Sequence, residues 1–170
     1  MSKELFLASE FVATKFSSAA EKAEFGNALL NFLDADFAPG LFSNKFYQRL
    51  SMTFGHIAHH NRSQFYEEWF ASLSAQVRFL EHTLRFPCYG DPEFTFSDVE
   101  REIQREVHNR NYLPRYQLLL AEEQRRAELT LLERLEGKYR SRQEDPEERP
   151  ASTPPGNGGE AVEPVQGLLF

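Results

Sequence analysis

"FSSAAEKAEFGNALLNFLDADF", residues 16–37, is the stretch of sequence that decides the fold. Ser18 stands three residues before Glu21, which is the capping-box pattern of a helix N-terminus. Beyond Glu21, large apolar side chains recur at intervals of three and four residues, as they do on one face of an amphipathic helix. These side chains are Phe25, Leu29, Phe32 and Leu33. The stretch therefore predicts a helix that buries one face.

The following segments show the same combination of a helix start and an apolar stripe. Pro39 and Gly40 end the first helix, and Ser43 can cap the second. One face of the second helix carries Phe46, Leu50, Phe54 and Ile57. Residues 61–87 then show a stripe so wide that we expect one central helix in contact with several neighbours. The stripe consists of Phe65, Trp69, Leu73, Val77, Leu80 and Leu84, extended by Tyr66 and Phe70.

Polar residues and turn formers mark the connections between these helices. We expect Asn61 to end one helix and Ser63 to cap the next. Residues 85–96 are rich in turn formers and predict a loop. Ser97, with Glu100 at the capping-box position, predicts the start of a short charged helix after that loop.

The longest helical pattern covers residues 113–142, with Pro114 in its first turn. One side of this helix carries Leu113, Leu120, Ala127 and Leu131. A second group, lying partly round the cylinder, consists of Leu118, Leu129 and Leu132. The heptad repeat is too irregular to predict a coiled coil. We expect this helix either to pack across the bundle or to pair with another chain through residues 114–140.

The composition changes at Glu144. Five of the nine prolines and four of the nine glycines follow this point, so a packed core cannot form there. We therefore expect an all-α protein with two parts. Residues 1–143 form a single compact bundle of about five helices, ending in the long helix, and residues 144–170 form a disordered acidic tail.

Charge and composition exclude several classes of function. The net charge is -7, of which the tail carries -5 and the body only -2. A nearly neutral body fits neither a mimic of DNA nor a basic DNA-binding domain, so we predict no direct binding of nucleic acid. The sequence shows neither a membrane-spanning run nor a signal peptide, and its single cysteine, Cys88, cannot form an intrachain disulfide. We therefore expect a cytoplasmic protein.

Three histidines form the densest polar group in the sequence. On a helix, His56 and His60 lie on the same flank, with His59 turned further outward, so two imidazoles could share a divalent metal ion. The candidates for a third ligand are Glu67, Glu68, His82 and His108. The other interpretation is a polar cluster of the histidines with Arg62 at a helix end, where cations complement the backbone carbonyl groups. We favour the polar cluster, and we predict no catalytic residue and no cofactor.

The run "RLSMTFGHIAHHNRSQFYEEWF", Arg49–Phe70, resembles a stretch found in uncharacterised proteins of bacterial plasmids, phages and related mobile elements. The resemblance covers roughly the first half of the chain. It implies a genomic setting and no particular reaction.

The last five residues, "QGLLF", resemble a second known pattern. Bacterial proteins that bind the DNA-polymerase sliding clamp often carry Q-L-S/D-L-F at a chain end or in a loose linker. Gln166, Leu169 and Phe170 match the first, fourth and fifth positions of that pattern. Gly167 replaces the usual leucine, and Leu168 replaces the small or acidic third residue. The resemblance implies recruitment to the replication machinery.

Together these features predict a non-catalytic accessory or interaction protein of a bacterial mobile element. The first candidate for its protein partner is the bacterial sliding clamp. Three alternatives stay open. The first is a metal-binding protein or enzyme that uses His56 and His60. The second is a structural oligomer formed through residues 114–140. In the third, the apolar end of the tail docks on the chain's own body or has no role.

Overall fold

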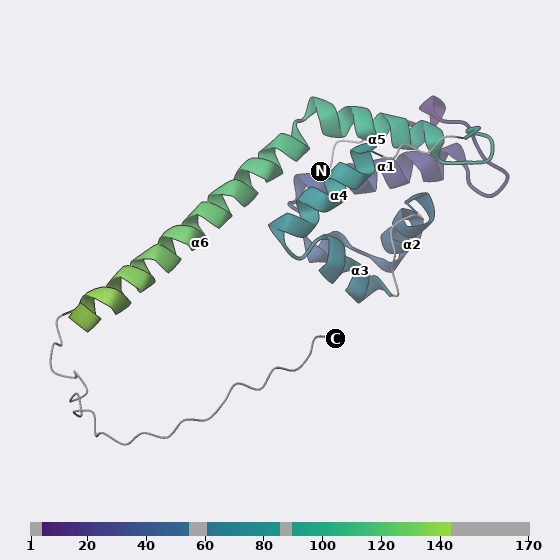
Figure 1. Cartoon of the computed structure of the whole chain (residues 1–170). Coiled ribbons are helices and arrows are strands. Elements are labelled where there is room, and N and C mark those ends of the chain that lie inside the picture. Colours follow the sequence, from purple (N-terminus) through teal and green to yellow (C-terminus); the bar gives the residue numbers. More distant parts are fainter. Residues whose placement is uncertain (1–4, 55–60, 86–89, 144–170) are drawn as a thin grey trace, which may run out of the picture. The chain divides into compact units, whose positions relative to one another are not determined.

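The computed structural model describes residues 5–54, 61–85 and 90–143, with the side chains of 83–85 and 141–143 left aside. Within these ranges it contains six α-helices, two short 3₁₀ helices and no β-strand (Figure 1). The all-α class predicted from the sequence is thus confirmed. The elements are η1 (Ala8–Glu10), α1 (Ala19–Asp34), η2 (Pro39–Leu41), α2 (Asn44–Thr53), α3 (Arg62–Trp69), α4 (Leu73–Arg85), α5 (Ser97–Asn109) and α6 (Tyr112–Gln143).

Residue contacts divide the chain into two units, 1–128 and 129–170. The division falls inside α6, so the first part of this helix belongs to the first unit. All the buried hydrophobic residues of the described ranges belong to the first unit.

Two helices begin where the sequence predicts. At the start of α1, Ser18 Oγ accepts a hydrogen bond from the backbone N–H of Glu21 at 3.2 Å. The Glu21 carboxylate in turn accepts from the N–H of Ser18 at 2.8 Å, and this bond lowers the pKa of Glu21. At the start of α2, Ser43 Oγ accepts from the N–H of Phe46 at 3.2 Å. Both predicted caps are confirmed.

Phenylalanine rings fill the centre of the first unit. Phe32 of α1 is completely buried. Its ring centroid lies 4.9 Å from that of Phe70 and 5.3 Å from those of Phe37 and Phe46. All three of these ring pairs meet edge to face, an arrangement that the aromatic quadrupole favours. The abundance of phenylalanine in the sequence is therefore explained by one aromatic core.

Gly26 allows α1 to pack closely against α5 and against Phe6 in the segment before η1. A Cβ atom at this position would lie 2.6 Å from a ring carbon of Phe6 and 3.1 Å from a methyl carbon of Val99. Since both neighbours are buried, neither can move away easily. The glycine is thus needed for close approach, although its backbone is ordinary helix.

The single central helix expected over residues 61–87 is wrong, because the chain turns after Trp69 and forms α3 and α4. The side chain of Gln76 donates a hydrogen bond to the carbonyl of Phe70 at 2.8 Å, and Ser72 Oγ accepts from the N–H of Ala75 at 3.2 Å. These bonds satisfy backbone groups that the break leaves without helical partners. The turn lets Phe65 of α3 and Phe79 of α4 both become fully buried.

Two predicted caps are also wrong. The residue that caps α3 is Asn61, whose Oδ1 accepts from the N–H of Gln64 at 2.9 Å, and Ser63 lies inside the helix. Ser97 is the first residue of α5 and does not cap it. Its buried hydroxyl donates instead to the carbonyl of Gly90 at 2.7 Å. The carbonyl of Gly90 in the preceding loop, and not the helix terminus, is thus the partner of this hydroxyl.

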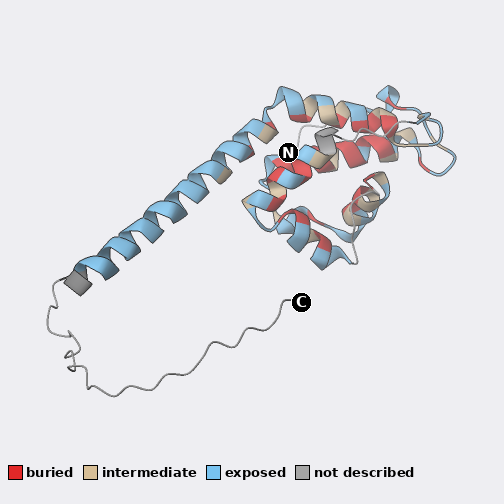
Figure 2. Ribbon diagram, viewed as in Figure 1, coloured by how far each residue is buried: buried red, intermediate tan, exposed pale blue. Residues whose placement is uncertain are grey.

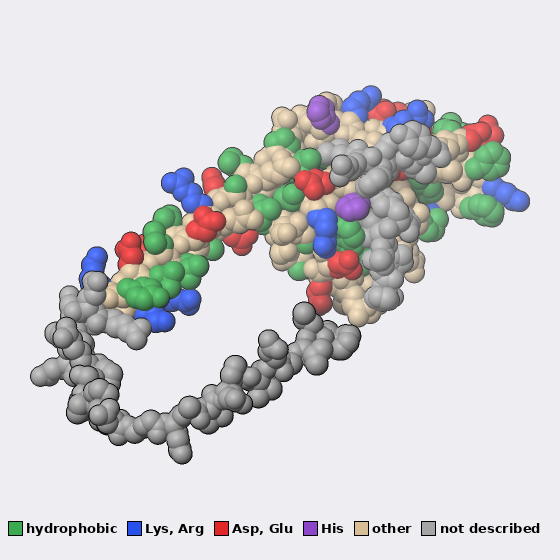
Figure 3. Space-filling model, viewed as in Figure 1, with side chains coloured by type: hydrophobic (Ala, Val, Ile, Leu, Met, Phe, Trp, Pro, Cys, Tyr) green, Lys and Arg blue, Asp and Glu red, His purple; other side chains and the backbone are tan. Residues whose placement is uncertain are grey.

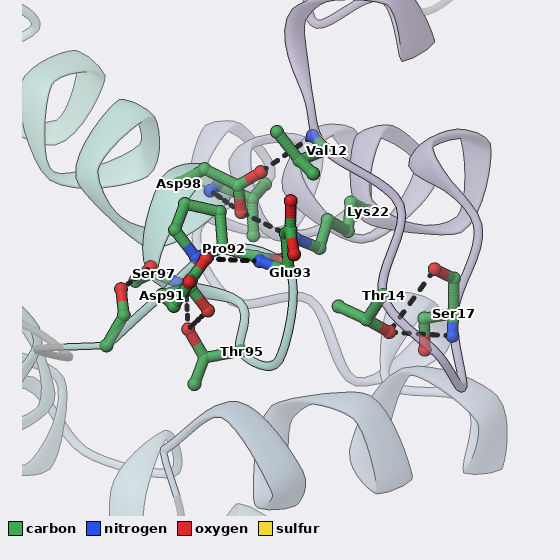
Figure 4. Close-up of polar contacts among 12 residues, drawn as sticks. Val12, Thr14, Ser17, Lys22, Asp91, Pro92, Glu93, Thr95, Ser97 and Asp98 are labelled. Carbon is green, nitrogen blue, oxygen red and sulfur yellow. Dashed lines mark hydrogen bonds and ion pairs between the residues drawn. The ribbon is translucent and has the colours of Figure 1, made fainter.

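A buried lysine joins α1 to the start of α5 (Figure 4). The Nζ atom of Lys22 lies 2.9 Å from Asp98 Oδ1 and 2.8 Å from the carbonyl oxygen of Pro92, and the Lys22 side chain is 0% exposed. The other carboxylate oxygen of Asp98 accepts from the N–H of Val12 at 3.0 Å. Lys22 and Asp98 therefore join the N-terminal part of the chain, from Val12 to Lys22, to the loop and helix start between Pro92 and Asp98.

We predict that Lys22→Met lowers the free energy of unfolding by about 2–4 kcal/mol, because it leaves Asp98 and a loop carbonyl without their cation. The matched control is Lys45→Met, which removes a lysine paired with Glu24 where both side chains are more than half exposed. That control should cost less than about 1 kcal/mol. Urea unfolding of both variants measures the difference, and equal losses would contradict a stabilising role for the buried pair.

Candidate protein-interaction surface

Two tyrosines attach the beginning of α6 to the end of α1. The hydroxyl of Tyr112 donates to Asp34 Oδ1, and the hydroxyl of Tyr116 donates to Asp36 Oδ1 at 2.7 Å. Both tyrosines are at most 2% exposed. Because the bonds lie one helical turn apart, they fix both the position and the rotation of the first turns of α6.

Arginines accompany both bonds. Arg110 Nη1 donates to Asp34 Oδ2 at 2.9 Å, and Arg115 Nη2 donates to Asp36 Oδ1 at 2.8 Å. Each carboxylate therefore binds one tyrosine hydroxyl and one guanidinium group. Each carboxylate favours the protonated form of the tyrosine beside it, whereas the neighbouring guanidinium group opposes that effect.

Burial is the main cause of a raised pKa at both tyrosines. It raises the pKa of Tyr112 to about 12, with a further upward contribution from the hydrogen bond to Asp34. The pKa of Tyr116 is raised for the same reasons, burial first and the bond to Asp36 second. Both hydroxyls are therefore donors throughout the neutral range, which is the form that the carboxylates require.

Beyond these anchors, α6 is exposed almost everywhere (Figure 2). Leu113 and Leu120 pack partly against the core, and every residue from 121 to 140 is exposed. Several of the exposed residues are large and apolar, which is unusual for a solvated helix. They are Leu118, Leu119, Leu129, Leu131, Leu132, Leu135 and Tyr139, with exposed fractions between 37% and 62%.

These apolar side chains are not spread evenly around α6. At about 100° per residue, Leu118, Leu132 and Tyr139 lie within about 60° of one another on the helical cylinder. Tyr112 and Tyr116 lie roughly opposite to them. Figure 3 shows hydrophobic side chains along α6 between Lys, Arg, Asp and Glu side chains. The exposed apolar side chains of α6 thus gather towards the side of the helix that faces away from Tyr112 and Tyr116.

The cavities described in the first unit have little catalytic character. A cavity of about 80 Å³ between α1 and α2 is lined in part by charged residues. Those charges neutralise one another, since Arg49 lies 2.6 Å from Glu21 and Lys45 lies 2.5 Å from Glu24. A wider groove of about 450 Å³ beside η1 is lined mainly by alanines, asparagines and Phe6. Neither brings together a nucleophile and a general base.

The sequence-predicted site residues fall mostly outside the described ranges. This applies to His56, His59 and His60, and equally to Gln166, Leu169 and Phe170. Among the described residues, no group of three or more His, Cys, Asp or Glu is placed to hold a metal ion. The metal site and the tail motif remain predictions.

The other candidate ligands are described, and the structure does not bring them together as a metal site. His82 is partly buried in α4, where its ring meets that of Trp69 edge to face at 5.3 Å between centroids. His108 is exposed in the last turn of α5. Glu67 and Glu68 are both exposed on α3.

Sequence reasoning missed the two anchoring tyrosines. Their signal was present, because Tyr112 and Tyr116 are four residues apart and share a face with Leu113 and Leu120. Their acceptors, however, lie almost eighty residues earlier in the chain. No local pattern connects Asp34 or Asp36 to a tyrosine in α6.

Comparisons with protein-family models, with curated proteins and with solved structures find no match for this chain. Among the described helices, none combines the length and the apolar character that crossing a membrane requires.

Tyr112 should make the protein sensitive to alkali. Its pKa is about 10 in the unfolded chain and about 12 in the folded one, so its contribution is fully present below pH 10 and is lost as the pH rises towards 12. Between pH 9 and pH 11.5 the free energy of unfolding of the wild-type chain should therefore decrease. We predict that this decrease is about 2 kcal/mol smaller in Tyr112→Phe. Urea unfolding at both pH values measures it. Tyr139→Phe, at an exposed position, is the control, and identical pH profiles of all three proteins would contradict the assignment.

Proposed function

We propose that this protein is a non-catalytic interaction protein that binds a protein partner through α6. The observation that carries the proposal is the row of large apolar side chains exposed on one face of this helix, from Leu118 to Tyr139. Exposed apolar surface of this extent is commonly a binding surface, since burying it against a partner is favourable.

The attachment of α6 supports the same proposal. Tyr112 and Tyr116 fix the first turns of the helix through buried hydrogen bonds, so its start is ordered before any partner binds. A helix that is already formed loses less conformational entropy on binding than a segment that folds on its partner. The attachment of α6 thus favours a binding face that is already formed before the partner arrives.

The proposal also covers the cellular compartment and the genomic origin of the protein. The lone cysteine supports a reducing compartment, and we place the protein in the bacterial cytoplasm. The resemblance of residues 49–70 to proteins of mobile elements supports a plasmid or phage origin.

Site-specific photo-crosslinking in cells tests the interaction function. A photoreactive amino acid at Leu132 should give covalent protein adducts, because that side chain lies at the centre of the exposed apolar face. The same amino acid at Arg134, about 160° away on the helix, is the matched control and should give few adducts. Mass spectrometry identifies the partner.

Two results would contradict the proposal. The first is the absence of adducts from Leu132 in cells where the chain is folded. The second is an equal yield from Leu132 and Arg134, which would indicate contact by chance.

A second candidate function is recruitment to the bacterial sliding clamp. The observation in its favour is the match of Gln166, Leu169 and Phe170 to the clamp-binding pattern. Leucine and phenylalanine side chains entering an apolar pocket could offset the entropy of ordering the segment, and a glutamine would add polar specificity. A linker of about twenty residues between α6 and the motif would act as a tether several tens of Å long.

Direct binding to a purified clamp tests this candidate. We predict a Kd in roughly the micromolar range for the full chain, and no binding for a version that ends at Val165. The double substitution Leu169→Ala/Phe170→Ala should weaken binding at least about tenfold, whereas Val162→Ala should leave it unchanged. Equal affinities of the full and shortened chains would exclude the tail as the clamp-binding segment.

A further inference from the structure

On the exposed side of α6, one set of positions follows the spacing of a heptad repeat, although the leucines of the helix taken together do not. Starting at Leu118, one set of residues recurs at strictly alternating intervals of three and four, which is the spacing of positions a and d in a coiled coil. We call these residues the heptad face: Leu118, Ala121, Arg125, Glu128, Leu132, Leu135 and Tyr139. All of them are exposed.

Among the described residues, the hydrophobic core does not include this face. The first turns of α6 pack through Tyr112, Leu113, Tyr116 and Leu120, which lie on the other side of the cylinder. Leu118, on the heptad face and two residues from the anchoring Tyr116, is 62% exposed. The side chains of the heptad face can therefore pack against a helix that lies outside the described part of the chain.

We infer that the heptad face binds a second copy of this chain, with the two α6 helices antiparallel. This inference rests on the proposed function and names the partner. Its basis is the charge pattern of the face, where one arginine and one glutamate stand three residues apart between apolar ends.

A parallel pair is disfavoured by these same charges. In a parallel, in-register pair, equivalent residues face each other across the seam. Arg125 would meet Arg125 of the second copy, and Glu128 would meet Glu128. Two like-charge contacts at the centre of an interface oppose association.

In one antiparallel register, the pairs formed by the heptad-face residues from Leu118 to Leu135 are all complementary, and Tyr139 falls opposite Pro114. Arg125 faces Glu128 of the second copy, and the two-fold axis generates the same pair again. On either side, Leu118 faces Leu135 and Ala121 faces Leu132. The charges meet each other, and the apolar residues meet apolar residues, so the face is complementary to itself, as an isologous contact requires.

Other antiparallel registers lack this match. A shift by one heptad places Arg125 opposite Leu135 and Glu128 opposite Leu132, which buries each charge against a leucine. The charged pair therefore specifies both the direction and the register of the helices, a role known for polar residues in coiled-coil seams.

Sedimentation equilibrium of the full-length chain tests the inference through a charge swap. The wild-type chain should be a dimer. Arg125→Glu alone and Glu128→Arg alone should each raise the dimer dissociation constant by at least about tenfold, because each leaves two like-charge contacts. The double variant Arg125→Glu/Glu128→Arg restores both pairs with their signs exchanged, and its dissociation constant should return to within about threefold of wild type.

Arg134→Glu changes the same type of charge away from the heptad face and should leave dimerisation unchanged. Circular dichroism and thermal unfolding show whether each variant keeps its fold, which is expected because the substituted side chains are exposed. A monomeric wild-type chain at tens of micromolar would overturn the inference. A dimer that the double variant fails to restore would overturn the antiparallel register.

The two proposals fail in different ways. If the photoreactive group at Leu132 reacts with a different protein while the wild-type chain sediments as a monomer, the interaction function stands and the second copy is wrong as its partner. If Leu132 gives no adduct in cells, the interaction function itself is wrong.

Discussion

The left-handed turn at Asp36 and Phe37 is the constraint on which the rest of the structure depends. Both residues have positive φ angles, 52° and 57°. A residue other than glycine adopts such an angle only at a free-energy cost of about 1–3 kcal/mol. The surrounding structure compensates for that cost. The ring of Phe37 is fully buried and stacks on Phe70 at 5.3 Å between centroids, and the hydroxyl of Tyr66 donates to the Phe37 carbonyl at 2.7 Å.

The same turn couples the aromatic core to α6. Phe37 points its ring into the core, while the adjacent carboxylate of Asp36 accepts hydrogen bonds from Tyr116 and Arg115. The Tyr116 ring also meets that of Phe37 edge to face at 5.3 Å. A loosened core would therefore release the start of α6 as well. Since the proposed interaction uses the exposed face of α6, the strained turn supports that proposed function by fixing the start of the helix.

The sequence predicts the helices better than their junctions. The capping box at Ser18 and the cap at Ser43 are local patterns, and both are present in the structure. The break between α3 and α4 could not be predicted in this way, because it depends on Phe65 and Phe79 both reaching a core built from other helices. Likewise, the role of Ser97 is decided by a carbonyl seven residues earlier, which accepts a hydrogen bond from its hydroxyl.

The sequence alone identifies only part of the candidate surface on α6, for a similar reason. The sequence shows leucines all round α6, and only tertiary packing distinguishes the partly buried Leu113 and Leu120 from the exposed Leu118 and Leu132. Once the buried side is known, the strict three-and-four spacing of the opposite side can be recognised. The irregular heptad seen in the sequence is thus the superposition of two faces, one facing the core and one facing outward.

Both α1 and α6 carry charged residues within an apolar stripe. On α1, Lys22 lies on the same side as Leu29 and Leu33, and its burial is accounted for by Asp98 within the same chain. On α6, Arg125 and Glu128 interrupt the heptad face in the same manner. An all-leucine face would bury more apolar surface, but it would accept parallel, antiparallel and shifted partners alike. A single arginine–glutamate pair gives up part of that apolar contact and leaves one arrangement in which no charge is buried without its opposite.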